Sequence, residues 1–61
     1  MTVYEQNYKN RLNEMLALIT EKYGMEDEKT VFFAQLVNKY INQATYTNRE
    51  TMEKMFKGLI N

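Results

Sequence analysis

The chain contains no cysteine, no histidine, no proline and no tryptophan among its 61 residues, and only two glycines. Without cysteine it cannot form disulfides or thiolate metal sites. Without histidine it lacks the commonest transition-metal ligand and the usual general base. Serine is absent as well, which removes the usual hydroxyl nucleophile. We therefore expect no bound metal, no cofactor and no enzymatic activity.

The chain also lacks an excess of charge of either sign, since eight Lys and Arg residues balance eight Asp and Glu residues. Nucleic-acid modules are usually basic. No apolar run approaches the roughly 20 residues of a membrane span, and the first residues lack the pattern of a signal peptide. We expect a cytoplasmic protein. The abundance of Asn, Lys, Tyr, Ile and Met is typical of an AT-rich genome, which indicates a bacterial, phage or plasmid origin.

What the chain does have is helical periodicity. Apolar residues recur about every 3.6 residues in three stretches, and few residues are present that would break a helix. The sequence predicts an all-α fold, a three-helix bundle in a single domain (1–61), with helices at about 3–23, 28–44 and 48–59. Gly24 suits the left-handed position that ends a helix. The acidic run Glu26 to Glu28 suits the start of the next one.

The expected core follows from the apolar faces of these helices. The second helix is the most apolar segment, so we expect it to be the central element. The residues predicted to be buried are Leu12, Ile19, Leu36, Tyr40 and Phe56. The alternative arrangement is a long hairpin of the first two helices that dimerises, with the third helix covering the seam.

Some apolar residues exceed what this small core needs. Leu18 lies off the main stripe of the first helix, and methionine provides an adaptable apolar surface on the third. The predicted partner surface comprises Leu18, Met15, Arg11, Met52 and Met55. We therefore predict a non-catalytic interaction module, an adaptor, inhibitor or accessory regulator that binds a protein partner or itself. A homodimer is expected because so short a chain has little stability in reserve.

DNA binding is the second hypothesis. The second helix, a short polar segment and the third helix have the order of a helix-turn-helix motif. The residues that could contact phosphates and base edges are Thr47, Asn48, Arg49, Thr51 and Lys54. However, Thr47 and Glu50 also have the spacing of a helix-capping box, which explains them without DNA.

Overall fold

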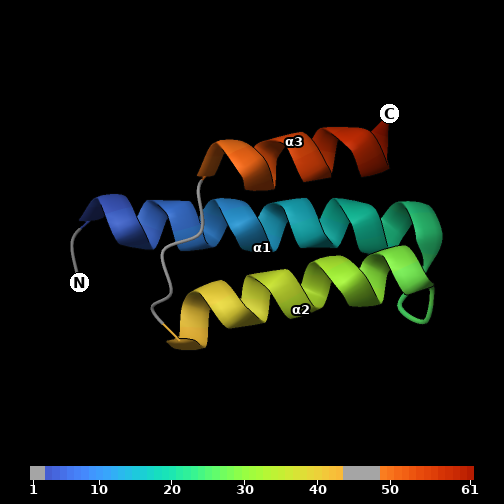
Figure 1. Ribbon diagram of the computed structural model, residues 1–61, viewed down its shortest axis with the longest axis horizontal. Helices are drawn as coiled ribbons and strands as arrows, with labels where there is room; N and C mark the ends of the chain where they lie inside the picture. Colours follow the sequence, from blue (N-terminus) through green and yellow to red (C-terminus); the bar gives the residue numbers. More distant parts are fainter. Residues whose placement is uncertain (1–2, 44–48) are drawn as a thin grey trace.

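The computed structural model describes residues 3–43 and 49–61 and contains three helices (Figure 1). These are α1 (Val3–Tyr23), α2 (Glu28–Gln43) and α3 (Arg49–Ile60), and the described residues include no strand. The all-α three-helix prediction is confirmed. Each described boundary is within one residue of its predicted position, whereas predicted end points 44 and 48 lie outside the described residues.

The corner between α1 and α2 is built by two local signals. Gly24 has a φ of 99°, a conformation that residues with a Cβ rarely adopt, and its N–H donates to the Thr20 carbonyl at 2.8 Å. This is the left-handed helix stop. The Asp27 carboxylate accepts from the Lys29 N–H at 2.8 Å, so it caps the first turn of α2. The acidic run therefore starts α2 as predicted.

The central helix is α1, not α2. α1 packs against both other helices, and Figure 1 shows it running between them. The buried apolar side chains are Tyr8, Leu12, Met15 and Ile19 of α1, Phe33 and Val37 of α2, and Met52 and Phe56 of α3. The expectation of a central α2 was wrong, because it rested on α2 being the most apolar segment, and the apolar content of a helix does not determine how many neighbours it contacts. Part of the apolar surface of α2 faces solvent, whereas α1 has two neighbours to contact.

α3 is attached to α1 by polar contacts near both ends. Near its start, the Arg11 guanidinium donates to both carboxylate oxygens of Glu53, each at 3.3 Å. At its end, the Lys22 ammonium donates to the Ile60 carbonyl at 2.5 Å and the Tyr23 hydroxyl donates to the Leu59 carbonyl. The last carbonyls of a helix have no partner within it, and cations there complement the helix dipole.

Burial separates the predicted core residues into two groups. Leu12 and Ile19 are fully buried and Phe56 is nearly so, as predicted. Leu36 and Tyr40 are only partly buried at the edge of the core. The apolar face of α2 is wider than the surface of α1 that it covers.

This difference predicts unequal costs for the same substitution. Leu12→Ala removes a fully buried side chain and should lower the free energy of unfolding by about 2–5 kcal/mol. Leu36→Ala removes a partly buried one and should cost less. Urea denaturation followed by circular dichroism measures both. Equal losses would contradict this placement of the core.

A second prediction concerns Thr30, which is 4% exposed and whose hydroxyl has no hydrogen-bond partner among the described residues. A buried polar group without a partner is destabilising. Thr30→Val should therefore raise the free energy of unfolding by about 1 kcal/mol, or the melting temperature by about 4–8 °C. Thr20→Val is the matched control because the Thr20 hydroxyl donates to the Leu16 carbonyl at 2.8 Å, so this variant should gain nothing. A Thr30→Val variant less stable than wild type would refute the assignment.

Candidate interaction surface

The predicted partner surface does not exist as a continuous patch. Met15 and Met52 are both fully buried in the core, so assigning them to a partner surface was wrong. Because α1 contacts two helices, its buried sector is wide enough to include Met15, and Met52 packs into the same core. Met55 is partly buried at its edge.

The other two predicted residues, Arg11 and Leu18, are both on the surface, but Arg11 is bonded to another side chain. Arg11 is bonded to Glu53, which raises the pKa of the guanidinium, and it lies 5.8 Å from the centre of the Phe56 ring. The side chains of Arg11 and Glu53 are 46% and 32% exposed, so water screens this pair and its contribution is modest. Leu18 is 47% exposed. Leu18 is therefore the one exposed large apolar residue of the predicted surface.

The residues predicted to contact DNA are only partly placed. Thr47 and Asn48 lie outside the described residues. The guanidinium carbon of Arg49 lies 4.5 Å from the centre of the Tyr8 ring, so Arg49 takes part in an intramolecular cation–π contact.

Thr51 and Lys54 are exposed on α3. The Lys54 ammonium lies 3.7 Å from the Glu50 carboxylate, one turn earlier. The positive charge of Lys54 on this side of α3 is therefore partly offset by the Glu50 carboxylate, which a DNA phosphate would repel. Moreover, α2 and α3 both run alongside α1 in Figure 1, whereas the two helices of a helix-turn-helix cross steeply.

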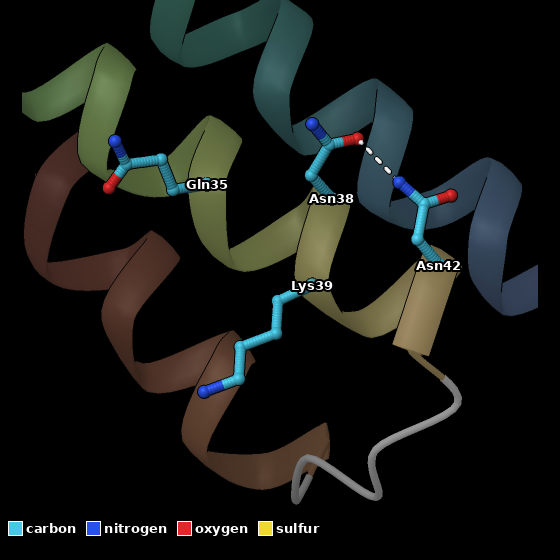
Figure 2. A pocket seen from close by; sticks show the side chains of 4 residues that line it. All are labelled: Gln35, Asn38, Lys39 and Asn42. Atoms are coloured by element: carbon cyan, nitrogen blue, oxygen red, sulfur yellow. Dashed lines mark hydrogen bonds between the residues drawn. The ribbon is translucent and has the colours of Figure 1, made fainter.

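A different surface stands out on α2. At about 100° per residue, six exposed residues from Val31 to Asn42 fall within about 120° of arc, and the exposed Glu28 of the first turn lies in the same arc. We call these six residues the α2 outer face: Val31, Phe32, Gln35, Asn38, Lys39 and Asn42. Figure 2 shows the last four on the near side of α2, where they line a shallow depression. The Asn42 amide donates to the Asn38 amide oxygen at 3.4 Å.

The α2 outer face is sparsely charged and partly apolar. Val31 is 42% and Phe32 is 49% exposed, and Lys39 is the single charged residue of the six. No Asp or Glu occurs anywhere from residue 29 to 43. The cores of protein interfaces are depleted in charge and enriched in aromatic residues. In the sequence, the signal for this face is the absence of Asp and Glu from residues 29 to 43. Such an absence is easily overlooked, because amide side chains are common on the exposed surface of a helix.

Other kinds of site receive no support from the part of the chain that the structure describes. Residues 3–43 and 49–61 include no group of three or more carboxylates placed to hold a metal ion. None of the described helices has the length and apolar character that a membrane crossing requires. Comparison with protein-family models, curated proteins and solved structures finds no match to this chain.

One group in the core should respond to pH. The Tyr8 ring packs edge-on against Tyr40, with 5.4 Å between centroids, and its hydroxyl is buried without a hydrogen-bond partner among the described residues. Burial raises the pKa of Tyr8 above its ordinary value of 10.0, and the negative charge of Glu53 raises it further.

The stability should therefore fall at alkaline pH. Below about pH 10 Tyr8 is neutral in both states and its full contribution is present. Above it the unfolded chain loses this proton first, so the free energy of unfolding decreases until the pH passes the higher folded pKa. Denaturation between pH 8 and 11 measures the fall, and Tyr8→Phe should reduce it. The same fall in wild type and variant would contradict the buried hydroxyl.

Proposed function

We propose that the chain is a non-catalytic helical interaction module of the cytoplasm, an adaptor, inhibitor or accessory regulator, and that it binds its protein partner through the α2 outer face. The observation that supports this is the half-exposed Phe32, next to Val31 and followed by a row of amides on a helix side where the acidic residue, Glu28, lies in the first turn. A lone exposed apolar residue needs no explanation. An aromatic residue at the end of a low-charge face is the composition expected of an interface.

Phe32 is the residue on which binding should depend most. Hot spots of protein interfaces are enriched in aromatic side chains, and truncating one costs about 2 kcal/mol or more. The amides of Gln35, Asn38 and Asn42 can each donate and accept, so they suit a partner that offers backbone or amide groups.

DNA binding through α3 has less support. Of its candidate residues, Arg49 stacks on Tyr8 and Lys54 lies beside Glu50. The net charge of the chain is zero, whereas phosphate contacts require a concentration of positive charge.

Affinity capture with matched variants tests the proposal. Tagged wild type, Phe32→Glu and Leu18→Glu are mixed with extract of the source cell, and the recovered proteins are quantified by mass spectrometry. Phe32 and Leu18 are exposed to nearly the same extent, 49% and 47%, so both variants should fold, which circular dichroism checks. We expect a partner that wild type and Leu18→Glu retain and Phe32→Glu loses by at least about tenfold. A partner retained by Phe32→Glu and lost by Leu18→Glu would place binding on α1 instead.

A further inference from the structure

We infer that the α2 outer face pairs with the same face of a second copy, so that two α2 helices pack antiparallel about a two-fold axis. This inference rests on the proposed function, because it uses the same surface, and it names the occupant. The first supporting feature is the spacing of Val31, Gln35, Asn38 and Asn42 along α2. Steps of four, three and four residues form the straight seam along which two helices pack.

The seam is complementary to itself when the helices run antiparallel. With the two-fold axis midway between Leu36 and Val37, Gln35 lies opposite Asn38 of the second copy, and Asn38 lies opposite Gln35. Each amide can then donate to and accept from its counterpart. A polar pair in such a seam fixes the register of the two helices.

The flank of the seam is complementary as well. Phe32 and Lys39 are seven residues apart, so they lie on the same side of α2. In the antiparallel pair, Lys39 of each copy comes within about 3 Å along the axis of Phe32 of the other copy. An ammonium group over an aromatic ring is attractive. The contact occurs twice, as a two-fold interface requires.

A parallel arrangement loses these contacts. In a parallel two-fold pair the flank of Phe32 and Lys39 lies on opposite sides of the seam in the two copies, so Lys39 could not reach Phe32 of the other copy. The two helix dipoles would also lie side by side in the same direction. Both effects favour the antiparallel pair.

The contact between two α2 outer faces is small, so we expect the dimer to be weak. One face of three to four helical turns covers a few hundred Å² per copy, below the roughly 800 Å² per partner of a stable complex. We therefore expect a weak dimer that forms only transiently. The dimer should appear only at high concentration.

Sedimentation equilibrium from about 10 μM to 1 mM tests the pairing, with wild type, Phe32→Glu and Leu18→Glu. Wild type and the similarly exposed control Leu18→Glu should dimerise alike, and Phe32→Glu should weaken the dimer at least tenfold. A monomer throughout this range, or a dimer unaffected by Phe32→Glu, would overturn the inference. A monomer whose capture of another protein still depends on Phe32 would overturn the self-pairing alone and leave the proposed function standing.

Because the chain has no cysteine, single introduced cysteines test the orientation. In the antiparallel pair, the two copies of residue 35 are about 5 Å apart along the axis and those of residue 42 about 16 Å apart. Under mild oxidation Gln35→Cys should cross-link and Asn42→Cys should not, because a disulfide requires close Cα atoms. Equal cross-linking of both would indicate a parallel pair and contradict the inference.

Discussion

The structure depends on one constraint, that the apolar stripe of α1 has to be covered from two sides. A 61-residue chain without cysteine has no cross-link to add to a small core. Among the residues whose burial the structure describes, half of the buried apolar side chains belong to α1: Tyr8, Leu12, Met15 and Ile19. α2 and α3 supply the other half, and their direct contact through Phe33 and Phe56 (6.4 Å between ring centroids) closes the core.

This arrangement determines what each outer helix can offer. α3 contributes Met52 and Phe56 to the core and engages α1 through Glu53 and its last carbonyls, so much of its side-chain chemistry is used within the molecule. α2 contributes a core face on one side only. Its opposite side, the α2 outer face, has exposed apolar and amide groups and the charge of Lys39, with Glu28 beside it in the first turn. The surface proposed for binding is thus the side that the core does not use.

The sequence was sufficient for the fold and insufficient for the surface. Periodicity and the signals at Gly24 and Asp27 are local, so the helices and the corner between them could be predicted from neighbouring residues. Whether Met15 faces a neighbour or solvent depends on how many helices α1 contacts, which is a tertiary property. The same reason explains Val31 and Phe32. They continue the apolar pattern of α2 but lie beyond the surface that α1 covers, as their exposure shows.

Amide hydrogen exchange in the native state, followed by NMR, tests most directly whether α1 is the element on which the others depend. Exchange rates report how much of the structure must open to free each amide, and the slowest amides open only on global unfolding. We expect the slowest amides to lie in α1, from Leu12 to Ile19, and the amides of α3 to exchange faster. If the slowest amides lay in α2 while this part of α1 exchanged quickly, the central role of α1 would be contradicted.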